Sequence, residues 1–186
     1  MSLLKKKKNQ NQLTTKPLLI VVMGVSGSGK STLASEFARR NKFTFLDADS
    51  LHSAQAIKQM SQGIPLTDEQ RLPWIKRIYN KLIESHGLKE NCILAYSGLK
   101  KAHRKVVFSS YEYKIGVLLK ANQELIIQRF ASRSNHFMSS QLLDSQFAEM
   151  EPFDHKEPLL ALNSADSVED LLKQLENFML SVTQKI

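Results

Sequence analysis

The sequence has 186 residues, of which 42% are hydrophobic, and it carries a formal net charge of +8. This length leaves no room for a second large domain, and there is no run of 18 apolar residues that could form a membrane-spanning helix. The single cysteine, Cys92, excludes an internal disulfide and a cysteine-based metal site, and it favours a reducing cytoplasm as the location.

The first sixteen residues form a basic segment that contains five lysines and no acidic residue. We therefore expect residues 1–16 to be a solvated, disordered tail and residues 17–186 to be one domain. The rest of the chain carries a net charge of only +3, which suits an enzyme that handles anionic phosphates and is too weak to predict a nucleic-acid partner. The apolar run after the tail is too short for a secretion signal and leads into glycines instead of a cleavage site.

Short β-rich runs alternate with segments of helical length along the domain, which predicts an α/β fold with a parallel sheet. The first, third and fourth runs are apolar almost throughout, as in strands that helices cover on both faces. We expect strands at residues 18–23, 43–46, 92–96, 113–119 and 158–162. Apolar residues at helical spacing predict helices around residues 33–38, 72–87, 125–130 and 168–178.

Residues 24–31 read Gly-Val-Ser-Gly-Ser-Gly-Lys-Ser and satisfy the pattern G-x-x-x-x-G-K-[ST]. The glycines allow a tight turn whose N–H groups approach phosphate oxygens, and the Lys30 ammonium adds charge for the β- and γ-phosphates. The Ser31 hydroxyl can bind Mg²⁺ at the positive end of the following helix. We therefore expect a P-loop NTPase fold with ATP and Mg²⁺ as cofactors. The residues expected to bind ATP are Gly24, Val25, Ser26, Gly27, Ser28, Gly29, Lys30, Ser31, Thr32 and Arg129.

The remaining sequence indicates a kinase rather than a GTPase or a hydrolytic ATPase. There is no Asn-Lys-x-Asp guanine-reading motif, and the third predicted strand does not end in an acidic pair. The second strand instead runs into Asp47 and Asp49, which alternation places on the same side of the chain. At the carboxyl end of the sheet, Asp47 could help Ser31 to hold Mg²⁺ while Asp49 accepts a proton from a substrate hydroxyl. The alternative role of Asp49 is to cap a helix that starts near Ser50.

A phosphoryl group in transfer also needs positive charge and protection from water. Arg129 and Arg133 are four residues apart at the end of a predicted helix and lead into a polar connection. This pattern predicts a small helical lid at about residues 130–145, with Arg133 as a catalytic residue that joins Lys30 and Asp49. The alternative is that both arginines are solvated surface residues.

Several motifs follow one another along the chain in the order in which a known family has them, and together they carry a family resemblance. Besides the phosphate loop they are Asp-Ser-Leu-His at 49–52, Gly-Ile-Pro-Leu-Thr-Asp at 63–68, Arg-Leu-Pro-Trp at 71–74, Ser-Gly-Leu-Lys-Lys at 97–101, and the stretch from Arg133 to Phe147. With these motifs the chain resembles, from about residue 21 to residue 152, the bacterial gluconokinases, which are small P-loop sugar-acid kinases related to shikimate and nucleoside monophosphate kinases. The resemblance implies phosphorylation of D-gluconate by ATP, a five-stranded parallel sheet, a helical substrate insert at about residues 50–88, and commonly a homodimer. It implies that the substrate residues are His52, Arg71, Lys100, Arg104 and Gln146.

The departures from the family pattern fall in the acceptor half of the chain. Losing hydrogen-bonding groups there can change discrimination between substrates by orders of magnitude. Three hypotheses therefore remain: a gluconokinase, a kinase for another sugar acid, shikimate-like polyol or nucleotide, and a nucleotide-binding regulator without catalysis. The departing residues are Ala48, Ser53, Ala56, Gln59, Tyr96, Gly98, His103 and Lys105.

Overall fold

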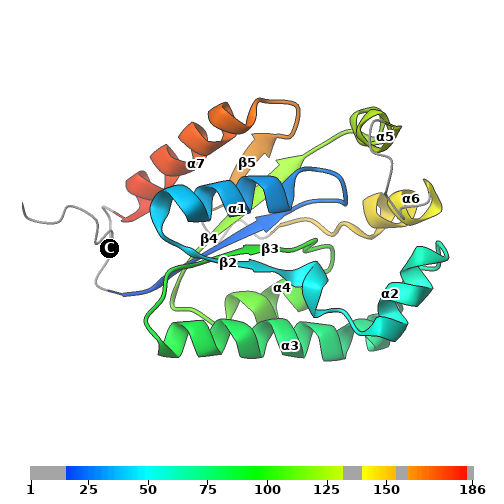
Figure 1. Cartoon of the computed structure of the whole chain (residues 1–186), viewed down its shortest axis with the longest axis horizontal. Helices are drawn as coiled ribbons and strands as arrows, with labels where there is room; N and C mark the ends of the chain where they lie inside the picture. Colours follow the sequence, from blue (N-terminus) through cyan, green and yellow to red (C-terminus); the bar gives the residue numbers. More distant parts are fainter. Residues whose placement is uncertain (1–15, 132–139, 154–158, 184–186) are drawn as a thin grey trace, which may run out of the picture.

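The computed structural model describes residues 16–131, 140–153 and 159–183. Its centre is a five-stranded parallel sheet in the order β2-β3-β1-β4-β5, with helices on both faces (Figure 1). The predicted α/β class and parallel sheet are therefore confirmed, and each predicted strand boundary lies within one residue of the observed one. The strands are β1 Leu18–Met23, β2 Thr44–Asp47, β3 Cys92–Ala95, β4 Tyr113–Lys120 and β5 Leu159–Asn163.

Helical crossovers connect the parallel strands, since a parallel neighbour cannot be reached by a tight turn. The four predicted helices are present as α1, α3, α5 and α7, and the short helices α2, α4 and α6 lie between them. The predicted lid at about residues 130–145 lies partly outside the described residues. The helices are α1 Lys30–Asn41, α2 Ala54–Ser61, α3 Asp68–Gly87, α4 Lys101–Phe108, α5 Gln123–Ala131, α6 Ser140–Glu149 and α7 Val168–Thr183.

Two apolar clusters fix these helices on the sheet. Side chains alternate along β1, so Ile20 and Val22 pack on one face with α1 and α7, while Val21 and Met23 pack on the other with α3 and α4. Figure 1 shows the same layers, with α1 and α7 on one side of the sheet and α3 and α4 on the other. Cys92 is buried in the second cluster, and burial raises the pKa of its thiol to about 12, which fits the role of a small core residue.

Helix α3 begins with a capping box. The Thr67 hydroxyl accepts a hydrogen bond from the Gln70 backbone N–H at 3.3 Å, and the Gln70 side chain accepts one from the Thr67 N–H at 2.9 Å. The predicted end at Gly87 is confirmed. Leu72 and Ile83 shared the predicted apolar spacing but are exposed at the edges of the packed face. The buried residues of α3 are Trp74, Ile75, Ile78 and Leu82.

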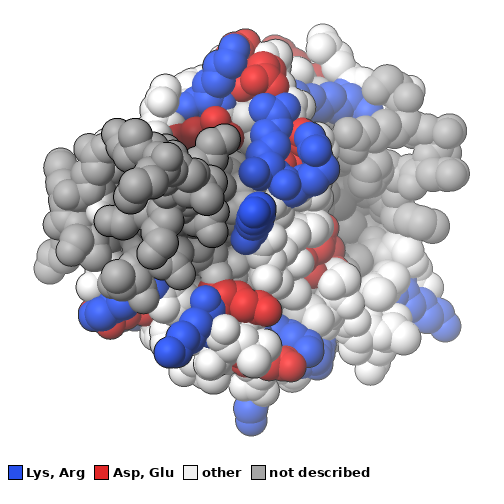
Figure 2. All heavy atoms as spheres, turned by 60° about the vertical axis from the view of Figure 1, so that its left-hand side comes forward, with Lys and Arg blue, Asp and Glu red and all other residues white. Residues whose placement is uncertain are grey.

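Charges of both signs are mixed on the surface. Figure 2 shows Lys and Arg side chains interspersed with Asp and Glu on one face. Near the end of α1, Arg40 forms ion pairs with Glu36 at 2.9 Å and with Glu169 of α7 at 2.8 Å. None of the helices in the described ranges is long and apolar enough to cross a membrane.

The functional end of the molecule is the edge where the strands end. Figure 1 shows α2, α5 and α6 around this edge, together with the loop that joins β1 to α1. In a sheet of this type ligands bind outside the carboxyl ends of the strands.

Candidate active site

The loop between β1 and α1 has the geometry of a phosphate cradle. Gly24 and Gly27 have φ angles of 144° and 76°, which side chains rarely tolerate. A Cβ atom on Gly24 would lie 2.8 Å from the Leu119 carbonyl oxygen, and one on Gly27 would lie 2.9 Å from the Phe130 ring. Gly29 precedes α1, and no side chain caps this helix end. The strand, loop and helix predicted around the motif are thus all present.

Lys30 lies folded into the loop. Its side chain is buried, and its Nζ atom donates a hydrogen bond to the Val25 carbonyl oxygen at 2.9 Å. Burial lowers the pKa of the Lys30 ammonium, while the negative charges of Asp49 and Asp47 oppose this shift. The ammonium is therefore held at the phosphate loop with both aspartates close enough to act on it.

Ser31 and Asp47 come together at the start of α1. The Ser31 hydroxyl donates to Asp47 Oδ2 at 2.7 Å, and Asp47 Oδ1 accepts a hydrogen bond from the Asp49 N–H at 3.0 Å. Asp47 therefore caps the 3₁₀ helix η1, Ala48–Leu51, and the alternative that Asp49 is the cap is wrong. Because the chain turns into η1 directly after Asp47, strand alternation does not extend to Asp49.

These two oxygen donors fit Mg²⁺. Mg²⁺ prefers hard oxygen ligands and usually takes one or two carboxylates, with phosphate oxygens and water completing its shell. Ser31 and Asp47 supply a hydroxyl and one carboxylate. Within the described ranges, there is no group of three or more His, Cys, Asp or Glu side chains that could hold a metal ion.

A second layer of contacts braces the phosphate loop. Arg129 of α5 donates from Nη1 to the Gly27 carbonyl at 3.2 Å and to the Ser164 hydroxyl at 2.7 Å, and from Nη2 to the Ser164 carbonyl. The Ser164 hydroxyl in turn donates to the Ser28 carbonyl at 2.6 Å. Sequence reasoning missed Ser164. Its only signal is its position directly after the last strand, at the same edge of the sheet.

Gln146 also contacts the phosphate loop. Its Oε1 atom accepts a hydrogen bond from the Ser26 N–H at 2.7 Å. Gln146, which was predicted to contact the substrate, thus connects α6, which overlaps the end of the predicted lid, to the phosphate loop. Arg133, the other predicted residue of this region, lies outside the described residues.

His52 follows η1 and stacks on Trp74 of α3, with ring centroids 4.2 Å apart and planes at 15°. The Trp74 indole N–H donates to the Ala48 carbonyl at 2.7 Å, which fixes the surface on which the imidazole lies. Burial lowers the pKa of His52, and the charge of Asp49 opposes this shift. The buried Nδ1 atom has no hydrogen-bond partner in the described part of the chain, so it can still accept or donate a bond.

Two of the three cationic residues predicted to bind the acceptor, Arg71 and Lys100, are paired with carboxylates. Arg71 Nη1 lies 2.7 Å from Glu149 Oε2 and 3.2 Å from Asp68 Oδ1, and its side chain is only 12% exposed. Lys100 Nζ lies 3.9 Å from Glu151 Oε1. The charges of both cations are therefore compensated by carboxylates of the protein.

Arg104 has a structural environment that the sequence did not indicate. Its side chain is 4% exposed and donates to the carbonyls of Gly98 at 2.7 Å, Leu99 at 3.0 Å and Pro152 at 2.6 Å. The guanidinium also lies over the Phe153 ring at 4.2 Å. These contacts hold the 98–99 turn in place.

The departing residues have defined local roles. Gln59 Nε2 donates to the Pro65 carbonyl at 2.9 Å, and its amide pairs with that of Gln70, which ties α2 to the start of α3. Ser53 caps α2 by accepting from the Ala56 N–H at 3.2 Å.

Other departing residues are packed inside the protein. Tyr96 and His103 are buried, and Ala48 is fully buried in the cluster that contains Trp74. A Cβ atom on Gly98, whose φ is 65°, would lie 2.8 Å from the Met23 side chain.

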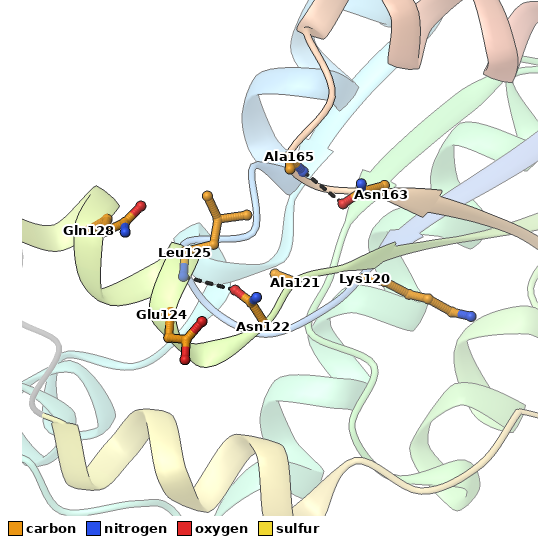
Figure 3. A pocket seen from close by; sticks show the side chains of 8 residues that line it. All are labelled: Lys120, Ala121, Asn122, Glu124, Leu125, Gln128, Asn163 and Ala165. Atoms are coloured by element: carbon orange, nitrogen blue, oxygen red, sulfur yellow. Dashed lines mark hydrogen bonds between the residues drawn. The ribbon is translucent and has the colours of Figure 1, made fainter.

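An open cavity of about 580 Å³ lies beside the phosphate loop, at the ends of β4 and β5. In Figure 3 its labelled side chains come from α5, from the last residues of β4 and β5, and from the segments that follow these two strands. The Asn122 side chain accepts from the Leu125 N–H at 2.9 Å, and the Asn163 side chain accepts from the Ala165 N–H at 3.1 Å. The lining residues are Lys120, Ala121, Asn122, Glu124, Leu125, Gln128, Asn163 and Ala165.

Comparison with known proteins agrees with this arrangement. The AAA domain family matches residues 19–153. Thermosensitive gluconokinase from Escherichia coli is 33% identical over 88% of this chain and 88% of its own, and gluconokinase from Arabidopsis thaliana is 40% identical over 74% of this chain and 79% of its own. The crystal structure of a gluconokinase from Sinorhizobium meliloti superimposes with a TM-score of 0.81, at 30% identity, over 91% of this chain and 95% of the other.

Proposed function

Because the chain belongs to the gluconokinase family and has its P-loop kinase fold, we propose that it transfers the γ-phosphoryl group of ATP to D-gluconate, forming 6-phosphogluconate and ADP. One observation carries the proposal. Asp49 connects the phosphate loop to His52: its N–H donates to Asp47 Oδ1 at 3.0 Å, Asp47 Oδ2 accepts from the Ser31 hydroxyl at 2.7 Å, and the Asp49 carbonyl accepts from the His52 N–H at 3.3 Å. A carboxylate beside the phosphate loop and next to a residue proposed to bind the acceptor is what a hydroxyl-phosphorylating kinase requires.

The proposed reaction is a direct in-line transfer. An acceptor hydroxyl oxygen forms a bond to the γ-phosphorus while the bond from that phosphorus to the β–γ bridging oxygen breaks. The hydroxyl proton passes to the Asp49 carboxylate, and ADP leaves with the electron pair of the broken bond. Lys30 stabilises the negative charge on the transferred group. Arg133 is proposed to add positive charge from the lid side.

The ATP side is built from the phosphate loop and its braces. The loop N–H groups and the start of α1 bind the phosphates, and the Arg129–Ser164 contacts keep the loop in its shape. Ser31 and Asp47 are the residues that would hold Mg²⁺, which when bound neutralises charge on the β- and γ-phosphate oxygens. The cavity at the ends of β4 and β5 is the proposed place for the base and ribose of ATP.

The acceptor side is proposed to bind the sugar acid through His52, Arg71 and Lys100. A gluconate ion has one carboxylate and several hydroxyls, so cationic and imidazole donors match its chemistry. Arg104 and Gln146 are proposed as positioning residues instead, because their hydrogen bonds go to the 98–99 turn and to the phosphate loop.

The proposal is tested with a coupled assay for ADP release. The purified protein is given ATP, Mg²⁺ and either no acceptor, gluconate, another sugar acid, shikimate or a nucleoside monophosphate. We expect gluconate to give the highest rate, and Lys30→Ala to abolish it. A gluconate rate no higher than the rate without acceptor overturns the proposal. ATP binding without acceptor-dependent ADP release across the panel would indicate a regulator.

We further propose a cytoplasmic homodimer that binds no nucleic acid. The family resemblance supports the dimer, and the single buried cysteine supports a reducing location. Light scattering after size-exclusion chromatography tests the dimer, and a mass equal to that of one chain would contradict it.

A further inference from the structure

The acceptor cations are neutralised by one short segment of the chain. Glu149, the last residue of α6, pairs with Arg71 at 2.7 Å, and Glu151, two residues later, pairs with Lys100 at 3.9 Å. Both carboxylates therefore lie where the carboxylate of an anionic acceptor would have to approach. An acceptor that binds either cation must share it with a carboxylate of the protein or displace that carboxylate.

The two carboxylates differ in what else they do. Glu151 Oε2 accepts a hydrogen bond from the Lys101 N–H at 2.5 Å, and the Glu151 N–H donates to the Leu99 carbonyl at 2.9 Å. These bonds hold the start of α4 in place, so Glu151 has a structural role. The Glu149 side chain is 25% exposed, and its buried Oε2 atom has no hydrogen-bond partner in the described residues. Its contact with Arg71 is close but lacks the geometry of a hydrogen bond.

The charge of Glu149 opposes an anionic acceptor at Arg71. A guanidinium binds a carboxylate through two parallel N–H groups. A second carboxylate at the same guanidinium brings two like charges together in a partly buried site, which costs free energy. A neutral polyol bound at the same place carries no such charge and incurs no such cost.

We propose that Glu149 is a specificity-determining residue that weakens the binding of anionic acceptors at Arg71 and so reduces the preference for a sugar acid over a neutral polyol. This inference rests on the proposed function, because it concerns the acceptor of that same reaction. Removing the charge of Glu149 is expected to strengthen the binding of an anionic acceptor, whereas a purely structural role for Glu149 predicts the opposite. If the ion pair only anchored α6 to α3, removing it would weaken acceptor binding.

The test compares Glu149→Gln with the wild-type protein in the ADP-release assay, using gluconate and glucitol, its neutral analogue with a hydroxymethyl group in place of the carboxylate. We expect the KM for gluconate to fall about tenfold in the variant, since a unit charge is removed from a mostly buried pair. The KM for ATP and the KM for glucitol should stay within about twofold of the wild-type values.

Asp68→Asn is the matched control. It removes a carboxylate from the same guanidinium, but the Asp68 side chain is 55% exposed and lies on the same helix as Arg71. Because solvent screens such a pair, the KM for gluconate should change less than about threefold. Glu149→Met, which keeps volume and removes charge, is used if Glu149→Gln does not fold, as judged by circular dichroism.

An unchanged or higher KM for gluconate in the Glu149 variant overturns the inference and leaves the proposed function standing. An equal fall in the KM for glucitol also overturns it, because the effect would not depend on acceptor charge. If neither protein binds gluconate in calorimetry or turns it over, while both bind ATP, the proposed function fails and the inference fails with it.

Discussion

Replacing Ser164 with alanine should loosen the phosphate loop from the end of the sheet. The Ser164 hydroxyl is buried, accepts from Arg129 Nη1 at 2.7 Å and donates to the Ser28 carbonyl at 2.6 Å. A hydrogen bond to a charged group contributes about 1.5–3 kcal/mol and a neutral one about 0.5–1.5 kcal/mol. We therefore expect the free energy of unfolding to fall by about 2–4.5 kcal/mol and the KM for ATP to rise.

The measurements are urea unfolding monitored by circular dichroism and ATP titration of the ADP-release rate. Ser109→Ala is the matched control. The Ser109 hydroxyl donates to the Val106 carbonyl at 2.7 Å on the exposed end of α4, so its loss should change stability by less than about 1 kcal/mol. Equal stability changes in the two variants would refute the bracing role of Ser164. A loss of stability without any rise in the KM for ATP would refute its connection to the phosphate loop.

Asp49→Asn should lower kcat by about 10²–10⁴-fold without changing the dissociation constant for ATP, because general-base transfer is lost; a kcat within threefold of wild type would contradict that role. Gly27→Ala should destabilise the protein by about 1–3 kcal/mol through positive φ and overlap with a neighbouring ring, whereas Gly87→Ala, which meets no neighbour, should not. Burial lowers the folded-state pKa values of His52 and His103 below 6.5, so the unfolded state binds more protons and stability should fall as pH decreases through 6.5. In urea unfolding at a series of pH values, His52→Gln should reduce this fall, and an unchanged pH dependence would contradict it.

The features that the sequence predicts well depend on neighbouring residues. The phosphate loop is a contiguous pattern with a strand before it and a helix after it, so its position and geometry follow from short-range chemistry. The strands and the long helices follow from periodicity in the same way. The motif also predicts that Ser31 lies in the first turn of the following helix, and α1 begins at Lys30.

The features that escaped prediction depend on contacts between distant segments. Ser164 meets Ser28 across 136 residues, and no pattern in either segment indicates this contact. Arg104 has the residue type of a substrate donor, but only the fold reveals that three carbonyls already surround its guanidinium. Asp49 was expected to follow strand alternation, but the turn into η1 at Ala48 changes the direction of its side chain.

The stacking of His52 on Trp74 gives the protein an internal optical reporter. Trp74 is the only tryptophan of the chain, so all indole fluorescence comes from the ring on which His52 stacks. An imidazole in contact with an indole quenches its emission more strongly when it is protonated. An acceptor that moves or charges His52 should therefore change the emission without any added dye, and a titration in a cuvette can rank acceptors before a single turnover is measured.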